Sequence, residues 1–146
     1  MEKYIVKIKS YYKNQVAQYG TGIVISENLI LTASHILCGD RYTVEIDGKE
    51  VEAELHITEG SGATLQSQTH FFEYCSIFSN EEILDEDSKW AVRGYIGELQ
   101  AEHEVSGIGF GKSGKTEIWD KTLLHIESGE VGVFWGFAGG RVFFAG

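Results

Sequence analysis

The chain has 146 residues, which is enough for one domain with a hydrophobic core and too few for a second independent domain. Its apolar fraction of 42% and charged fraction of 23% are typical of a globular protein and exclude a disordered or collagen-like chain. The formal net charge of −10, without a cluster of lysine and arginine, argues against nucleic acid or an anionic membrane surface as a partner.

The compartment expected from the sequence is the cytosol. Residues 1–8 lack the long apolar core of a signal peptide. No segment approaches the roughly 18 to 20 apolar residues of a membrane span. Two cysteines are present, Cys38 and Cys75, and in a reducing compartment we expect both to be free thiols in or near the core.

Apolar and polar residues alternate in many short runs separated by turn residues, a period of two that is typical of β-strands. The predicted strands are residues 4–8, 21–25, 29–32, 42–46, 51–57, 70–78, 90–96, 105–110, 123–126, 131–135 and 141–144. Asp47-Gly48 predicts a tight hairpin turn, because both positions tolerate a positive φ. Residues 59–68, rich in Gly, Ser and Thr, and the acidic residues 79–89 are predicted to be exposed loops. Many short strands indicate a barrel or a sandwich.

The most informative segment is Gly20 to Leu37, which reads GTGIVISENLILTASHIL. It predicts a glycine-led strand, a turn at 26–28, and a second strand that delivers His35 at its end, where a rigid sheet can fix an imidazole for proton transfer. This run resembles the start of the trypsin-like serine peptidases of the chymotrypsin fold. The resemblance implies that His35 is the catalytic histidine.

A second segment, Gly136 to Phe143, reads GFAGGRVF and is similar to the nucleophile loop GFSGGPVF of many bacterial members of that family. The resemblance places Ala138 where the nucleophilic serine stands. It also implies that the backbone N–H groups of Gly136 and Ala138 form the oxyanion hole, which an alanine would preserve. The alternative is that Ala-Gly-Gly forms an ordinary hairpin turn between two strands.

The family also uses a carboxylate that heads a strand about forty residues after the histidine, because a carboxylate holds the imidazole in the correct tautomer. Glu73, at the start of the run EYCSI, has this spacing. The alternatives are that Asp85 or Asp87 is the acid, or that it is absent. The order His35, Glu73, position 138 is the order that this family uses.

For the whole chain the resemblance implies one trypsin-like peptidase domain over residues 1–146. The expected fold is all-β, with two small antiparallel barrels of the six-strand type in the chymotrypsin-like class. The first barrel would cover about 1–80, and an abbreviated second barrel about 88–146. Only eight residues follow Ala138, which leaves three alternatives for the second barrel: further sequence completes it, a partner chain supplies its last strands, or the short barrel closes differently.

Two functions follow from the resemblance. The first is a serine endopeptidase, acting on protein or peptide substrates, that is inactive because Ala138 replaces the serine, whether by engineering or naturally. The second is a natural pseudoprotease that binds a peptide or protein without cutting it. Neither function needs a cofactor.

Other motifs compete with this interpretation. Residues Gly109 to Thr116 match the phosphate-binding P-loop, so nucleotide binding is a remote alternative, although no later strand ends in the required aspartate. Ser128 is a rival nucleophile, but it lacks the glycines that build an oxyanion hole. Cys75 is expected to be a small buried apolar residue. The remaining histidines lack the spacing of a metal site, and no metal is expected: His56, His70, His103 and His125.

Overall fold

The computed structural model describes residues 3–60, 62–71, 73–74, 89–96, 98–108, 114–118, 121–125 and 141–145. Within these residues every regular element is a β-strand, apart from one short 3-10 helix, η1 (Ser34–Ile36). The strands are β1 (Ile5–Tyr12), β2 (Gln15–Val24), β3 (Leu29–Ala33), β4 (Arg41–Ile46), β5 (Lys49–Glu59), β6 (Gly62–Ser67), β7 (Lys89–Ile96), β8 (Ala101–Ile108), β9 (Gly114–Ile118), β10 (Lys121–His125) and β11 (Arg141–Ala145). The predicted all-β class is confirmed.

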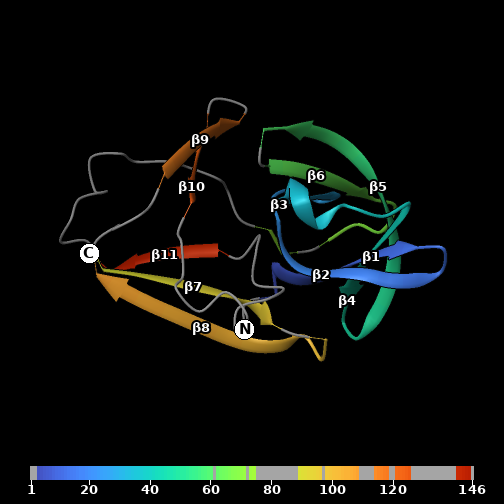
Figure 1. Cartoon of the computed structure of the whole chain (residues 1–146), viewed down its shortest axis with the longest axis horizontal. Helices are drawn as coiled ribbons and strands as arrows, with labels where there is room; N and C mark the ends of the chain where they lie inside the picture. Colours follow the sequence, from blue (N-terminus) through green and yellow to red (C-terminus); the bar gives the residue numbers. More distant parts are fainter. Residues whose placement is uncertain are drawn as a thin grey trace.

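The first six strands form a closed antiparallel barrel in the order β1-β2-β3-β6-β5-β4 (Figure 1). The barrel closes where β4 pairs with β1, with Val44 opposite Ile8. Because closure pairs the strands with one another around the barrel, their paired edges are protected against pairing with other chains. The first of the two predicted barrels is therefore present.

The core of the barrel follows from alternation along its strands. In β1, Val6 and Ile8 are buried, whereas the alternate residues Lys7 and Lys9 are only half-buried. Burial of such apolar side chains is the main favourable term in folding. The buried cluster that fills the barrel is Val6, Ile8, Val24, Ile30, Ile36, Val44, Ala53, Leu65 and Phe71.

Two tight turns connect barrel strands through residues with positive φ. Asp47 (φ 50°) and Gly48 (φ 79°) join β4 to β5, which confirms the predicted hairpin. Lys13 (φ 51°) and Asn14 (φ 65°) join β1 to β2 in the same way, and the sequence analysis did not predict this turn. Asparagine adopts a positive φ more readily than most residues, so Asn14 is the residue from which this turn could have been predicted.

Two predictions in the middle of the chain are wrong. The predicted loop 59–68 contains β6, whose Ala63 and Leu65 are fully buried, because β6 fills the gap between β3 and β5 and closes the barrel. Small polar residues are accepted there because neighbouring strands supply the packing, which overrides local propensity. In the predicted strand 70–78, the described residues 70–71 and 73–74 are not in a strand.

The remaining described strands lie beside the barrel as a three-stranded sheet, β11-β7-β8, and a two-stranded sheet, β10-β9 (Figure 1). They lie in the region predicted for the abbreviated second barrel. Strand β8 begins four residues earlier than predicted, and β9 was not predicted at all. The predicted strand 131–135 falls outside the described residues.

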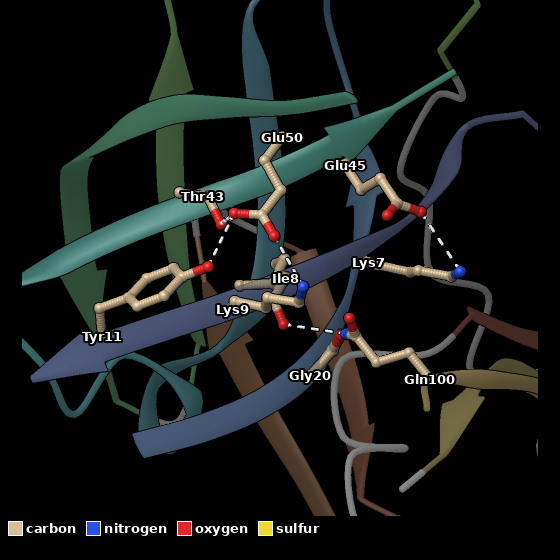
Figure 2. A network of polar contacts seen from close by, with 9 residues as sticks. All are labelled: Lys7, Ile8, Lys9, Tyr11, Gly20, Thr43, Glu45, Glu50 and Gln100. Atoms are coloured by element: carbon tan, nitrogen blue, oxygen red, sulfur yellow. Dashed lines mark hydrogen bonds and ion pairs between the residues drawn. The ribbon is translucent and has the colours of Figure 1, made fainter. Parts of the chain in front are cut away.

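Specific hydrogen bonds hold β7 and the β7–β8 turn against the barrel. The Tyr95 backbone N–H donates to Thr21 Oγ1 (3.0 Å), and the Tyr95 hydroxyl donates to the Ile5 carbonyl (3.3 Å). The amide of Gln100, a residue only 4% exposed, donates from Nε2 to the carbonyls of Ile8 (3.1 Å) and Gly20 (3.3 Å) (Figure 2). Gln100 therefore ties the turn between β7 and β8, and with it the three-stranded sheet, to β1 and β2.

We expect Gln100→Asn to lower the free energy of unfolding by about 1–2 kcal/mol, because a shorter amide leaves two buried carbonyls without their donor. Asparagine tolerates the positive φ of Gln100 (47°), so the backbone is not strained by this change. Urea denaturation would measure the loss. The matched control is Leu99→Ala in the same turn, where the side chain is 93% exposed. Equal stability of the two variants would contradict the assigned bonds.

A polar network covers the outer face of β1, β4 and β5 (Figure 2). The Glu50 carboxylate accepts hydrogen bonds from Lys9 Nζ (2.6 Å), the Tyr11 hydroxyl (2.7 Å) and Thr43 Oγ1 (3.3 Å). Burial by itself would raise the pKa of Glu50. The hydrogen bonds from Lys9 and Tyr11 and the charge of Lys9 outweigh it, so that the pKa of Glu50 is lowered from its ordinary 4.5.

A lowered pKa in the folded state means that ionised Glu50 stabilises the fold above its unfolded pKa of 4.5. That contribution is lost as the pH falls through the folded pKa. We therefore expect Glu50→Gln to be less stable than the parent by up to about 1 kcal/mol at pH 7, with the difference shrinking below pH 4.5. Urea denaturation at a series of pH values measures this, with the exposed Glu54→Gln as the control. A difference independent of pH would contradict the assignment.

Candidate active site around His35

His35 lies in η1, directly after β3. Ala33 is still extended (φ −79°, ψ 137°), and the turn closes where the Leu37 N–H donates to the Ser34 carbonyl (3.1 Å). The His35 side chain is exposed, whereas the next residue, Ile36, is fully buried in the core. The turn is thus anchored from within while the imidazole faces solvent.

The residues around His35 each fix the turn. The Thr32 hydroxyl donates to the Thr21 carbonyl (2.8 Å), and Ser34 Oγ donates to the Gly60 carbonyl (3.1 Å). Beneath the turn, Ile36 packs so closely on Gly20 that a Cβ there would lie 2.5 Å from Ile36 Cγ2. The backbone that carries His35 is therefore held by its neighbours, and a fixed backbone is one requirement for placing a proton-transfer group.

The structure does not place Glu73 in a contact with His35. Glu73 is exposed and lies 4.0 Å from Lys3 Nζ through its Oε1. Two residues earlier, the Phe71 N–H donates to the Glu27 carbonyl (2.6 Å), in the turn where β3 begins. His35 follows the other end of β3, whose five residues span about 13 Å.

Comparison with protein-family models gives no match, and comparison with curated proteins gives none either. Solved structures do match. The active form of the Rv3671c protease from M. tuberculosis is 21% identical, with a TM-score of 0.71, over 97% of this chain and 65% of that chain. The HtrA-type protease AlgW, solved with a tripeptide, is 16% identical, with a TM-score of 0.69, over 96% and 46%. The serine endoprotease from Yersinia pestis is 16% identical, with a TM-score of 0.65, over 96% and 49%.

The chain has the chymotrypsin-like protease fold. The solved proteases share this fold at 16% to 21% identity, and the chain spans from about half to about seven-tenths of their lengths. The closed six-stranded barrel and the strands beside it are the parts of the chymotrypsin-like fold that the structure describes. This confirms the predicted fold class.

Several predicted site residues lie outside the described residues. They are Gly136, Ala138, the alternative acids Asp85 and Asp87, the rival nucleophile Ser128, and Cys75. Their roles in a chymotrypsin-like site stay predictions. Cys38 is described and is a free cysteine as expected, but it is exposed, not in or near the core.

The P-loop interpretation does not fit the backbone that is described. Gly114, Lys115 and Thr116 lie in β9, which pairs with β10, whereas a P-loop needs its Gly-Lys-Thr to open a helix. Across the described ranges no group of three or more His, Cys, Asp or Glu is arranged to hold a metal ion. Across the same ranges, no helix has the length and apolar character needed to cross a membrane.

The hairpin between β5 and β6 lies against η1, the turn that carries His35, and the sequence pattern did not predict it. The sequence predicts an exposed loop over residues 59–68, and this prediction does not connect Gly60 with the site. The hydrogen bond from Ser34 Oγ to Gly60 brings this hairpin against η1. In β6 every residue except Gln66 is buried, so the strand lacks the alternation of apolar and polar residues that would have predicted it.

Proposed function

We propose that the chain is a trypsin-like serine endopeptidase domain, inactive because Ala138 replaces the nucleophilic serine. The observation that carries the proposal is the exposed His35, fixed by buried neighbours at the end of β3 in a barrel of the chymotrypsin-like fold. The similarity of residues 136–143 to a protease nucleophile loop supports it from the other end of the chain.

In the proposed mechanism a serine at position 138 attacks the carbonyl carbon of the scissile peptide bond. The His35 imidazole removes the hydroxyl proton as the new C–O bond forms, and later gives that proton to the leaving amine. The backbone N–H groups of Gly136 and position 138 stabilise the oxyanion. Water then attacks the acyl-enzyme, again with His35 as the base. With alanine at 138, no oxygen is present to begin this sequence.

The proposed substrate is a peptide or protein in extended form, and no nucleic acid or membrane takes part. AlgW, one of the proteases of similar structure, was solved with a tripeptide, which supports a peptide ligand. Since the chain spans as little as 46% of the chains that it resembles, the proposal includes further sequence or a partner chain that completes the second barrel.

A second candidate function, a natural pseudoprotease that binds peptides without cutting them, is favoured by Ala138 itself. The experiment that separates the two is reaction with a fluorophosphonate probe, read by intact mass. The Ala138→Ser protein is compared with the chain as given. A protease gains one probe adduct on Ala138→Ser and none without it. A folded Ala138→Ser protein that stays unlabelled refutes the protease and leaves peptide binding.

A further inference from the structure

Strand β5 is longer than the pairing that covers one of its two edges. Strand β4 pairs with β5 from Lys49 to Ala53, and β6 pairs with the opposite edge from Ala53 to Glu59. The residues from Glu54 to Glu59 therefore pair with β6 alone. In Figure 1 this part of β5, drawn in green, lies beside β6 and away from β4. All six of its residues are exposed.

The chain that precedes β4 is held elsewhere and does not extend the pairing with β5. The Gly39 N–H donates to Ser10 Oγ (2.8 Å), and the Asp40 N–H donates to the Tyr11 carbonyl (2.8 Å). Both bonds hold this segment on β1, which is the neighbour of β4 on the side opposite β5. Along residues 54–59, alternate backbone N–H and C=O groups point away from β6, and no strand in the described ranges receives them. An exposed row of such groups is a template for adding a strand from another chain.

Three side chains at this edge form a row on the outer face of β5. Residues directly opposite each other in an antiparallel pair point to the same face. On β6 the alternate residues on one face are Gly62, Thr64 and Gln66. Their partners on β5 share that face because of the register shift in this part of β5, and they are Glu59, Ile57 and Glu54. This face points away from the core, since Leu65, on the other face of β6, belongs to the buried cluster.

The two glutamates of this row have no cation beside them. Other glutamates on β4 and β5 are each paired with a cation, and these pairs are Glu45–Lys7, Glu50–Lys9 and Glu52–Arg41. For Glu54 and Glu59 the described part of the chain supplies no such partner. Two unpaired carboxylates on either side of an exposed isoleucine, in a chain with a net charge of −10, favour a ligand of opposite charge.

We propose that the edge of β5 from Glu54 to Glu59 binds an extended segment of a partner protein as an added strand. The segment carries Lys or Arg on both sides of an apolar residue, at alternate positions. The basic side chains face the two glutamates, and the apolar side chain packs on Ile57. A second copy of this chain does not fit, because two such edges paired antiparallel set Glu54 of one copy opposite Glu59 of the other, and like charges in that position are destabilising. The proposal does not depend on the proposed function.

The first test exchanges the charges on the two sides of the contact. Two fluorescent peptides, Thr-Lys-Thr-Val-Thr-Lys-Thr and the same peptide with Glu in place of Lys, are titrated with the chain as given and followed by anisotropy. We expect saturable binding of the Lys peptide with a Kd below about 1 mM, and binding of the Glu peptide at least about 10-fold weaker. In the double variant Glu54→Lys, Glu59→Lys this preference should reverse.

The matched control for the charge exchange is the double variant Glu27→Lys, Glu98→Lys, which makes the same change of charge at two exposed glutamates in other turns. It should keep the preference of the parent for the Lys peptide. The proposal is overturned if the Lys peptide does not bind saturably, or if the control changes the preference as much as the β5 variant does. A preference that survives Glu54→Lys, Glu59→Lys overturns it as well.

The second test asks whether the peptide backbone pairs with β5. N-methylation of alternate residues removes the N–H donors on one edge of an extended peptide, so two versions of the Lys peptide are made, one for each edge. We expect one version to keep its affinity and the other to lose at least about 10-fold, whereas equal affinities refute an added strand. Sedimentation equilibrium of the chain alone should show a monomer. A dimer that the Lys peptide dissociates would assign the edge to a second copy and overturn the proposal.

Discussion

In the Ala138→Ser background, His35→Ala is expected to slow fluorophosphonate labelling by at least about 10³-fold. Without a base to remove its proton, the serine hydroxyl is a weak nucleophile at neutral pH. The loss is expected in the rate of labelling and not in the fold, because the His35 side chain is exposed and the turn is held by Ser34 and Ile36. The measurement is the labelling rate by intact mass, together with the thermal unfolding temperature.

The matched controls for this experiment are His56→Ala and His70→Ala, which alter two other exposed histidines of the described barrel region. Both should label at the rate of the Ala138→Ser parent. Unchanged labelling of the His35→Ala variant would remove His35 from the proposed mechanism. Equal losses in all three variants would mean that histidine replacement acts through stability and not through proton transfer.

Gly20→Ala is expected to cost about 3 kcal/mol of unfolding free energy, or roughly 10 °C in the unfolding temperature. A Cβ at position 20 would lie 2.5 Å from Ile36 Cγ2 and 2.9 Å from two further atoms of the same side chain. Ile36 is fully buried and cannot move aside without displacing the core. Because Ile36 directly follows His35, the labelling rate in the Ala138→Ser background should fall as well.

A double-mutant cycle provides the control for this steric argument. Ile36→Ala removes the methyl and methylene groups that collide, at its own cost of about 2–5 kcal/mol for the cavity. Adding Gly20→Ala to Ile36→Ala should then cost less than about 1 kcal/mol, so the two changes are strongly non-additive. Additive losses, measured by urea denaturation, would show that the Gly20 methyl does not meet Ile36.

Several strands, one hairpin turn and the candidate base His35 could be predicted from local sequence. Residues 20–37 carry a strand, a turn, a second strand and His35 in one continuous segment, and the structure has β2, β3 and η1 there. Asp47-Gly48 predicted its hairpin because the conformation of a two-residue turn depends on those two residues. The protease resemblance of these segments led to the correct fold class, since short motifs of this kind are read without knowledge of strand pairing.

The tertiary contacts of Glu73, the predicted carboxylate partner of His35, could not be read in this way. Spacing along the chain predicts Glu73 for this role, and the role stays a prediction. The structure adds that the nearby Phe71 N–H donates to the Glu27 carbonyl in the β2–β3 turn and that Glu73 Oε1 lies 4.0 Å from Lys3 Nζ. Strand β6 lies in a segment that the sequence predicts as a loop, because its residues are small and polar and show little local strand preference.

The sequence by itself therefore determined the all-β class, the strands next to its clear turns, and His35 as the candidate base. Only the tertiary structure decided that β6 inserts between β3 and β5, and that Gly60 lies against η1, where its carbonyl accepts a hydrogen bond from Ser34 Oγ. The physical reason is that strand pairing joins residues far apart in the chain. The register of those pairs decides which side chains face each other. The spacing of residues along the sequence does not give that register.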